Sequence, residues 1–325
     1  MKLWSIDESV AKQTLEVTSQ LRKTDGDNNL SCNVSTNDQM LQYCQLQTHF
    51  FTDTFFVTKK AVSTRGNTCM QIYVSDKGFV YVAPMQSKGE FLSSLKLFAK
   101  EVGVPYALIV DPAGEQTSSK VKLFCNQIST TLRILEEGTQ WANRAELYVG
   151  LFKEGVRKDM RMTNSPLVLW DYCAERKARI HNLTARNLFQ LQGTNPYTAT
   201  LGVEGDISNL CVFGWYDWCY FQSQSNSFPF PTEELGRVLG PGKNSGNEMA
   251  QWVLKKNGKI VPRRSLQKLK PEELHNNPSE LVKRQEFDKA IKELLGDSCN
   301  ENRKMRRKNY NNMSTVSYVG TVLTE

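Results

Sequence analysis

The sequence has few of the residues that build zinc modules. Its three histidines lie far apart, and none of its eight cysteines forms a C-x-x-C pair. Several cysteines stand in apolar runs, where a small buried side chain is their ordinary role. The spacing of these residues therefore excludes a zinc module.

Long hydrophobic runs are also lacking. The longest, Leu210 to Phe221, is interrupted by Asp217 and is shorter than the roughly 18 residues that a membrane helix needs. The amino terminus, which begins Met1-Lys2-Leu3, has no signal-peptide hydrophobic core. We therefore expect an intracellular protein that is neither secreted nor inserted in a membrane.

A charge excess is absent from the first three quarters of the chain. Residues 1–239 hold 24 basic and 24 acidic side chains, whereas residues 240–325 hold 17 basic and 10 acidic ones. The net charge of +7 thus comes from the last quarter. Nucleic acid is the usual partner of such a segment, the alternative being a merely solvated terminus.

One carboxylate lies in the middle of a segment that is otherwise typical of a buried β-strand. Asp53 lies in the middle of the aromatic run His49 to Phe56, which has the composition of a buried central strand. Burying an unpaired carboxylate is costly. Asp53 is therefore either exposed at the rim of the strand or held ionised by a partner such as a metal ion, and we favour the metal.

Two further acids support the metal. Asp111 ends a second strand-like run, Tyr106 to Val110, and so lies where open α/β sheets place their sites. Glu146 lies in the helical segment Trp141 to Met160, at the border of its buried face. Three acids on two strands and a helix edge can meet at one point and hold a divalent metal.

The order Asp53, Asp111, Glu146, with 34 residues between the last two, resembles the DDE triad of the retroviral integrase superfamily. The strings around these acids resemble integrases of copia-class LTR retrotransposons, and the resemblance runs from about His49 to about Leu269. It is carried by Phe51-Thr-Asp-Thr-Phe55, Ser63-Thr-Arg-Gly-Asn-Thr68, Lys77-Gly-Phe79, Trp141-Ala-Asn-Arg-Ala-Glu146 and Leu169-Trp-Asp-Tyr-Cys-Ala174.

The resemblance implies a fragment of a Pol polyprotein. Asp53, Asp111 and Glu146 would bind two Mg²⁺ or Mn²⁺ ions, which suit carboxylate oxygens. The reaction would be 3′-end processing and strand transfer of element DNA into target DNA, without a covalent enzyme intermediate. The partners implied are the element ends, the target DNA and further copies of the chain, at least as a dimer.

The element pattern and the resemblance predict the same α/β fold. Three antiparallel strands followed by alternating helices and strands indicate a ribonuclease-H-like mixed five-stranded sheet flanked by helices. The expected strands are 49–56, 67–74, 79–85, 106–110 and 131–136, and the expected helices are 88–103, 118–128, 141–160 and one opened by Pro166.

Four regions are expected along the chain. Residues 1–45 are predicted to be a flexible polar flank, and residues 46–225 an integrase catalytic core with a helical extension. Residues 226–270 are predicted to form a small β-barrel-like module with strands at 235–239, 248–255 and 259–264. Residues 271–325 are predicted to be a charged, partly helical but mostly disordered basic tail.

Further residues are candidates for DNA contact, although an ordinary solvated face is the alternative for each. They are Asn143, Arg144, Lys153 and Arg157 on the Glu146 helix, and Lys255, Lys256, Lys259, Arg263 and Arg264 in the module. The aromatic residues of 210–221 are expected to fill a core rather than to stack on bases. His181 is not expected to be a catalytic base, because two-metal phosphoryl transfer does not require one.

Two other functions stay open. The resemblance would imply a His/Cys zinc module before the catalytic core and a polar residue after the second aspartate, but this sequence has no such module and has Pro112 at that position. These departures and the unusual amino-terminal flank are consistent with a catalytically inactive, integrase-derived nucleic-acid-binding protein. A cellular ribonuclease H or exonuclease would share the fold. The run Arg303 to Lys308 predicts a nuclear localisation signal or a DNA-binding arm, and we expect a nuclear protein with a cytoplasmic phase.

Overall fold

The structure is a computed structural model that describes residues 4, 6–20, 45–136, 143–187, 190–223, 229, 232–243, 249–269 and 277–296. The predictions for Trp141, for the run Arg303 to Lys308 and for most of the tail fall outside these residues. Among the described helices, none is long and apolar enough to cross a membrane.

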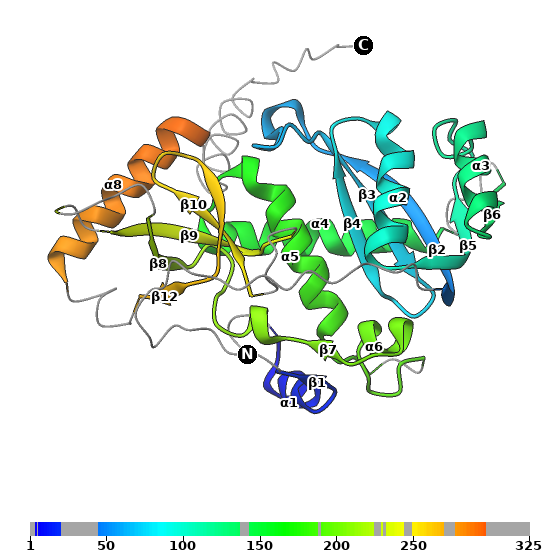
Figure 1. The fold of residues 1–325 in the computed structure, drawn as a ribbon, viewed down its shortest axis with the longest axis horizontal. Helices are drawn as coiled ribbons and strands as arrows, with labels where there is room; N and C mark the ends of the chain where they lie inside the picture. Colours follow the sequence, from blue (N-terminus) through cyan, green and yellow to red (C-terminus); the bar gives the residue numbers. More distant parts are fainter. Residues whose placement is uncertain are drawn as a thin grey trace, which may run out of the picture.

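A mixed five-stranded sheet forms the first half of the molecule, in the order β4-β3-β2-β5-β6 (Figure 1). β3 is antiparallel to both β2 and β4, whereas β5 is parallel to both β2 and β6. This is the ribonuclease-H-like arrangement, so the predicted fold class is confirmed. The strands are β2 (Gln45–Phe56), β3 (Cys69–Ser75), β4 (Val80–Met85), β5 (Val104–Val110) and β6 (Thr131–Ile134).

Helices cover both faces of this sheet because its strands are apolar on both sides. α2 (Phe91–Glu101), preceded by a 3-10 turn at Lys88–Glu90, and α3 (Ser119–Gln127) cover one face, where Phe50 is completely buried. α4 (Arg144–Thr163) covers the other face, packing Phe152 near Phe55. Helix α5 (Trp170–Leu183) follows a 3-10 turn at Leu167–Leu169 and lies between β4 and the second sheet (Figure 1).

A second, antiparallel sheet has the order β11-β10-β9-β8-β12. Three of its strands match the predicted module, while β8 and β12 were not expected. Because β8 belongs to it, the sheet begins upstream of residue 226. Its strands are β8 (Trp218–Gln222), β9 (Glu233–Pro241), β10 (Gln251–Lys255), β11 (Ile260–Arg263) and β12 (Leu266–Lys268).

The aromatic run fills a core, as predicted. Cys219 and Phe221 lie two residues apart on the same side of β8. Both are fully buried and pack with Val253 in the core of the second sheet. On the other side of β8, Trp218 packs edge-on against Phe287 of α8 (Pro278–Leu295), at 5.2 Å between ring centroids. Phe221 thus packs in the core of the second sheet, and Trp218 packs against α8.

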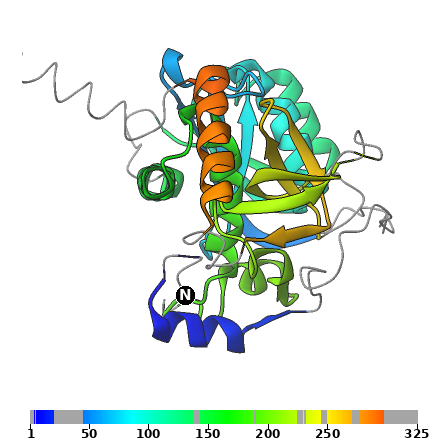
Figure 2. The same ribbon diagram turned by 90° about the vertical axis from the view of Figure 1, so that its left-hand side faces the viewer.

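The amino-terminal flank is folded where it is described, contrary to the expectation of a flexible segment. It forms α1 (Glu8–Glu16), the dark blue helix in Figure 2, and β1 (Thr18–Ser19), which pairs in parallel with β7 (Gly205–Asp206). Trp4 is buried, and its indole N–H donates to the carbonyl of Leu210 at 3.1 Å. The amino-terminal segment packs against residues between 180 and 210, which include α6 (Pro196–Leu201) and the 3-10 turn Ser208–Leu210. The local sequence pattern of the flank did not indicate that it would pack against residues so far away in the chain.

Candidate active site

Asp53 lies within β2, and Asp111 directly follows the neighbouring parallel strand β5, which ends at Val110. The register sets Phe51 opposite Ile109, and each acid comes two residues further along its chain segment. Neighbouring strands lie about 4.8 Å apart, and side chains alternate between faces. Asp53 shares its face with Phe55, which packs against α4. The two predicted acids therefore lie side by side under α4.

Glu146 enters from the first turn of α4, which Asn143 anchors. The Asn143 side chain caps the helix by accepting a hydrogen bond from the Ala145 amide at 3.0 Å. Its Nδ2 donates to Asp111 Oδ1 at 2.9 Å and to the Thr52 carbonyl at 3.3 Å. One polar side chain thus fixes the start of α4 to both acid-bearing strands. Glu146 follows within the same turn and is exposed.

The three acids influence one another electrostatically. Burial raises the pKa of Asp53, and the negative charges of Asp111 and Glu146 raise it further. A 2.6 Å hydrogen bond from the Thr54 amide and the positive charge of Lys153 act in the opposite direction. Like charges gathered in this way repel unless a cation lies among them. The site therefore favours binding of a positively charged group.

A network of side-chain hydrogen bonds joins the two residues that flank Asp53, and it was not predicted from the sequence. Thr52 and Thr54 flank the aspartate and are joined through Gln71, whose Nε2 donates to Thr52 Oγ1 at 2.6 Å and whose Oε1 accepts from Thr54. Gln116 Nε2 reaches Thr54 Oγ1 at 3.5 Å. The two threonines in the string Phe51 to Phe55 are the only local signal, because both glutamines are distant in sequence.

The donor set fits a hard divalent cation. Among the described residues, no three His, Cys, Asp or Glu side chains are placed closely enough to enclose an ion. Carboxylate oxygens are nevertheless the ligands that Mg²⁺ and Mn²⁺ prefer. The pKa of Asp53 is raised mainly by burial, and the further effect of the Asp111 and Glu146 charges is the repulsion that such an ion would relieve. The buried Gln116 Oε1 also has no hydrogen-bond partner among the described residues. Asp53, Asp111 and Glu146 are the residues that would hold the ion.

Lys153 of α4 lies close to the acids. Its ammonium is 4.9 Å from the centroid of the Phe55 ring, and its charge acts on Asp53. Partial burial lowers the pKa of Lys153, and the neighbouring charge of Arg157 lowers it further. Arg157 is exposed one turn later, while Arg144 lies 5.9 Å from the Tyr148 ring. Of the predicted DNA-binding cations of α4, Lys153 is thus the one whose charge acts on the acids, while Arg144 lies by Tyr148.

The predicted cations of the module lie on the second sheet and are partly neutralised. Lys255 pairs with Glu234 at 2.9 Å, and Lys256 pairs with Glu286 at 3.0 Å. Burial works against ionisation of Glu234, but hydrogen bonds from Ser223 and Lys255 outweigh it and lower its pKa. Of the other three, Lys259 is exposed, Arg264 is partly buried, and Arg263 lies 5.8 Å from the Phe221 ring. Intramolecular pairing of this kind was not visible in the sequence.

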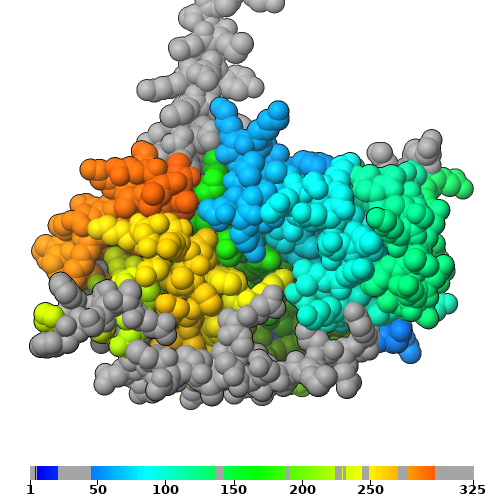
Figure 3. Space-filling model, turned by 45° about the horizontal axis from the view of Figure 1, so that its top comes forward, coloured from blue at the N-terminus to red at the C-terminus, as the bar shows by residue number. Residues whose placement is uncertain are grey.

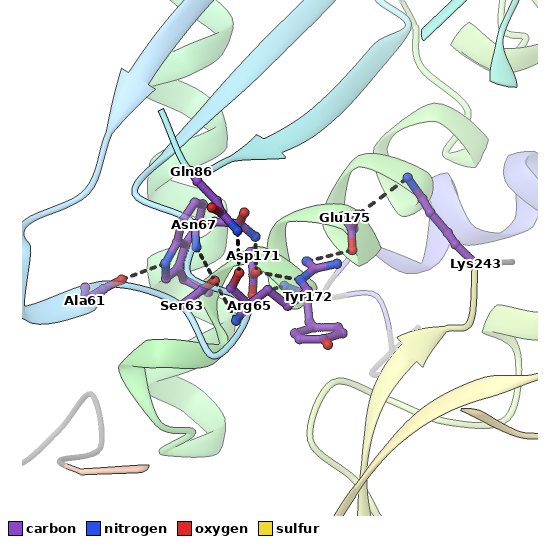
Figure 4. Close-up of polar contacts among 10 residues, drawn as sticks. Ala61, Ser63, Arg65, Asn67, Gln86, Asp171, Tyr172, Glu175 and Lys243 are labelled. Carbon is purple, nitrogen blue, oxygen red and sulfur yellow. Dashed lines mark hydrogen bonds and ion pairs between the residues drawn. The ribbon is translucent and has the colours of Figure 1, made fainter. Parts of the chain in front are cut away.

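Two of the strings that carry the resemblance meet in a clasp of hydrogen bonds and ion pairs around the buried Asp171 (Figure 4). Arg65 Nε donates to Asp171 Oδ2 at 2.7 Å, and Arg65 Nη2 donates to Glu175 at 3.1 Å. Asn67 Nδ2 donates to the same Asp171 oxygen at 2.8 Å. The residues 63–68 and 169–174 therefore tie the connection after β2 to α5, which is a structural role.

Lys243 extends this clasp to the second sheet. Its ammonium lies 3.5 Å from Glu175 Oε1 and 3.3 Å from Glu101 Oε2, so it contacts both α5 and α2. In Figure 3 the connection after β2, in blue, lies between the yellow and orange elements of the second sheet and α8 and the cyan elements of the first sheet. The clasp thus holds the two halves of the molecule against each other.

Both ring nitrogens of His181 are engaged in hydrogen bonds within the protein. Arg186 Nη2 donates to its Nδ1 at 2.8 Å, so its Nε2 carries the proton and donates to the Gly78 carbonyl at 2.9 Å. Burial, reinforced by the charge of Arg186, lowers the pKa of His181 to about 3. The imidazole is neutral and fully engaged near neutral pH, so it fastens α5 to the β3–β4 turn.

Comparisons with known proteins give structural similarity alone. No family model matches the chain, and no curated protein matches it. One similar solved structure is a simian T-cell lymphotropic virus intasome in complex with PP2A regulatory subunit B56 gamma, with 13% identity over 77% of this chain and 89% of that chain and a TM-score of 0.40. Another is the HTLV-2 integrase catalytic core domain in complex with magnesium, in a dimeric form, with 16% identity over 48% of this chain and 97% of that chain and a TM-score of 0.37. The fold assignment rests on the strand order.

Proposed function

We propose that this chain is a DDE-type polynucleotidyl transferase, the integrase of a copia-class LTR retrotransposon. It would process 3′ ends of element DNA and join them to target DNA in a metal-dependent reaction. One observation carries the proposal: Asp53 on β2 and Asp111 just after the adjacent parallel strand β5 each come two residues past the pair Phe51 and Ile109, and Glu146 lies in the first turn of the covering helix. The mutual repulsion of the three acids supports a cation-binding role.

The described side chains divide the work of such a site. When bound, Mg²⁺ or Mn²⁺ supplies activation of the attacking hydroxyl and stabilisation of the leaving oxygen. Asp53, Asp111 and Glu146 provide the negative oxygens that hold the ions. Asn143 binds one oxygen of Asp111 and thereby orients its carboxylate. Lys153 places a positive charge beside Asp53, where a DNA phosphate would approach.

DNA would extend from the acids along α4. Arg144, Lys153 and Arg157 follow the helix, whereas the module offers Lys259 and the half-neutralised Lys255 and Lys256 as a second contact. Neutralising phosphates in this way makes DNA binding strongly dependent on salt. The partners in this proposal are element ends, target DNA and further copies of the chain, in the nucleus after a cytoplasmic phase.

A catalytically inactive nucleic-acid-binding protein is the second candidate. The observation that favours it is that the described acids are not gathered into a closed ligand set. The basic residues of α4 would then bind DNA without cleaving or joining it.

Mn²⁺-dependent resolution of a branched DNA substrate that mimics an integration product separates the two functions. We expect wild type to resolve the branch and Asp53→Asn and Glu146→Gln to lose this activity while still binding DNA. Glu293→Gln, which neutralises an exposed carboxylate on α8, is the matched control and should remain active. Salt-sensitive DNA binding without branch resolution by wild type would establish the second candidate instead.

A further inference from the structure

The edge of the first sheet that bears the acids also carries an exposed aromatic ring. β2 and β4 are parallel to each other, because β3 is antiparallel to both, and β5 is parallel to β2. These three strands therefore end at one edge of the sheet. Phe56 is the last residue of β2, three residues past Asp53 and about 10 Å from it along the strand. Half of its surface is exposed, and no other phenylalanine that the structure describes is as exposed.

The packing of the sheet does not account for this ring. Side chains alternate along a strand, so Phe56 points to the face of the sheet opposite to Asp53. Among the described residues, the ring belongs to no hydrophobic cluster. The ammonium of Lys88 lies 5.2 Å from the ring centroid and 3.2 Å from Glu115 Oε1, in the connection that follows Asp111. The ring therefore lies beside the connections that follow β4 and β5, with half of its surface open to solvent.

The connection after β2 continues with two exposed cations. Lys59 and Lys60 open the 3-10 turn that ends at Ala61, and neither forms an ion pair with a described residue. In Figure 3 this connection, in blue, stands out from the surface. The Ala61 amide donates to the Thr58 carbonyl at 2.8 Å, and the Trp170 indole N–H donates to the Ala61 carbonyl at 2.8 Å (Figure 4). The two lysines are thus presented on an ordered backbone, which lowers the entropy cost of binding.

We propose that Phe56 stacks on an unpaired base at the end of the DNA substrate, while Lys59 and Lys60 bind the adjoining phosphates. The inference rests on the proposed function, because that function brings a DNA end to acids about 10 Å from the ring. Every base has a face on which an aromatic side chain can stack, whatever the sequence. An unpaired base enters such a contact without the cost of opening a base pair. Phe56 is then a specificity-determining residue that favours frayed ends over continuous duplex.

This contact lies on the opposite side of the acids from the cations of α4. Lys153 lies by Phe55 on the face of the sheet to which Asp53 points, whereas Phe56 and Lys88 lie on the other face, at the same edge. A DNA strand that passes the acids would meet Lys153 on one side and the Phe56 ring on the other. The two contacts should therefore fail independently. Loss of Lys153 should weaken binding of all DNA, whereas loss of the ring should weaken binding of unpaired ends alone.

Fluorescence anisotropy measures the preference for unpaired ends. Two labelled duplexes of the same sequence are compared with the full chain, one fully paired and one with unpaired nucleotides at one end, in EDTA so that no turnover occurs. We expect wild type to bind the frayed duplex more tightly, and Phe56→Ala to lose at least about fivefold in affinity for that duplex only. Phe56→Trp should keep the preference. Phe56→Leu should lose it, because leucine is apolar but has no ring.

Tyr106→Ala is the matched control for the ring. Tyr106 is 60% exposed on β5 of the same sheet, toward the edge away from the acids, so its removal should leave the preference unchanged. Lys59→Ala/Lys60→Ala should weaken binding of both duplexes alike and reduce the slope of log K against log salt concentration by about 2. Lys96→Ala/Lys100→Ala removes the same charge from exposed positions of α2 and should change that slope less.

Photocrosslinking locates the unpaired base. A duplex with iodouracil at the unpaired position should become attached to Phe56 on irradiation, as peptide mass spectrometry can show. Equal affinity of Phe56→Ala and wild type for the frayed duplex, or a crosslink in the second sheet, would overturn the proposal. A loss confined to a duplex with an internal unpaired nucleotide would overturn it too, by assigning the ring to distorted target DNA. Asp53→Asn should show the wild-type preference, so failure of the catalytic proposal is distinguishable.

Discussion

Asn143 Nδ2 donates a hydrogen bond of 2.9 Å to Asp111 Oδ1, while the Oδ1 of the same asparagine caps α4. Formation of the helix and orientation of the second acid are thereby coupled through one side chain. An aspartate or serine at this position would cap the helix equally well, but neither has an amide nitrogen to donate to Asp111. Asn143 is therefore a positioning residue in the proposed reaction.

Substitution of Asn143 should separate its two roles. Asn143→Ser keeps a helix cap but loses the bond to Asp111, so we expect near-normal stability and reduced strand transfer. Asn143→Ala loses both and should also lower the free energy of unfolding by about 1 kcal/mol. Urea denaturation and branch resolution, measured on both variants, check this. Equal activity of Asn143→Ser and wild type would contradict a positioning role.

Stability in the absence of divalent metal should fall as the pH rises through the range in which Asp53 ionises. The pKa of Asp53 is raised above its ordinary value of 3.8, so the folded state holds the proton more tightly than the unfolded state does. Stability is therefore greatest below pH 3.8 with respect to this group, and it is lost as the pH rises through the raised pKa. Asp53→Asn should be more stable than wild type at pH 7 in EDTA, and the difference should vanish near pH 3.

Divalent metal should make wild type more stable than Asp53→Asn, which reverses the order of stability expected without metal. Mn²⁺ at 100 times its dissociation constant stabilises a folded protein by about 2.7 kcal/mol, so the melting temperature of wild type should rise when it is added at pH 7. Asp53→Asn should respond much less, because it lacks one of the three carboxylates. An equal response of both proteins in thermal denaturation would argue against metal binding at these acids.

Lys153 should contribute to DNA binding more than a cation that is already paired. Lys153→Ala should weaken binding and reduce the slope of log K against log salt concentration by about 1. Lys256→Ala removes a lysine that pairs with Glu286, so we expect a smaller change. Fluorescence anisotropy with a DNA duplex across a salt series measures both. Equal slopes for the two variants would show that intramolecular pairing does not matter.

The clasp should matter for stability and not for chemistry. The Asp171 side chain is fully buried and binds both Arg65 and Asn67. Removing one partner of a buried ion pair costs about 3–5 kcal/mol, and the lower end applies because the Arg65 side chain is 32% exposed. Asp171→Ala should therefore destabilise the protein by roughly 3 kcal/mol in urea denaturation.

A surface ion pair provides the control for the clasp. Lys256 and Glu286 are both more than half exposed, so Glu286→Ala should change stability by less than about 1 kcal/mol. At a temperature where Asp171→Ala is folded, its activity per folded molecule should match wild type. A specific loss of activity would instead place the clasp in the catalytic machinery.

The order of the elements could be predicted from the sequence because local patterns encode it. The aromatic composition of residues 49–56, the apolar run that ends before Asp111 and the helical spacing from Trp141 to Met160 are all patterns of a few residues. The placement of Asp53, Asp111 and Glu146 on two strands and a helix edge follows from those patterns. Within the first sheet and its helices the errors were at element ends, such as the 3-10 turn that precedes α2, whereas α1, β1, β8 and β12 were not expected at all.

Contacts between distant segments were decided only by the tertiary structure. Trp4 is buried against residues between 180 and 210, and β8 pairs with β9 in the second sheet. Asp171 accepts hydrogen bonds from both Arg65 and Asn67. Glu234 likewise partly neutralises the positive charge of Lys255, which the sequence alone presents as available for DNA. Hydrophobic periodicity reports which side of an element is buried but not which surface covers it. Partners far apart in the chain are selected by packing and charge complementarity, which exist only once the chain has folded.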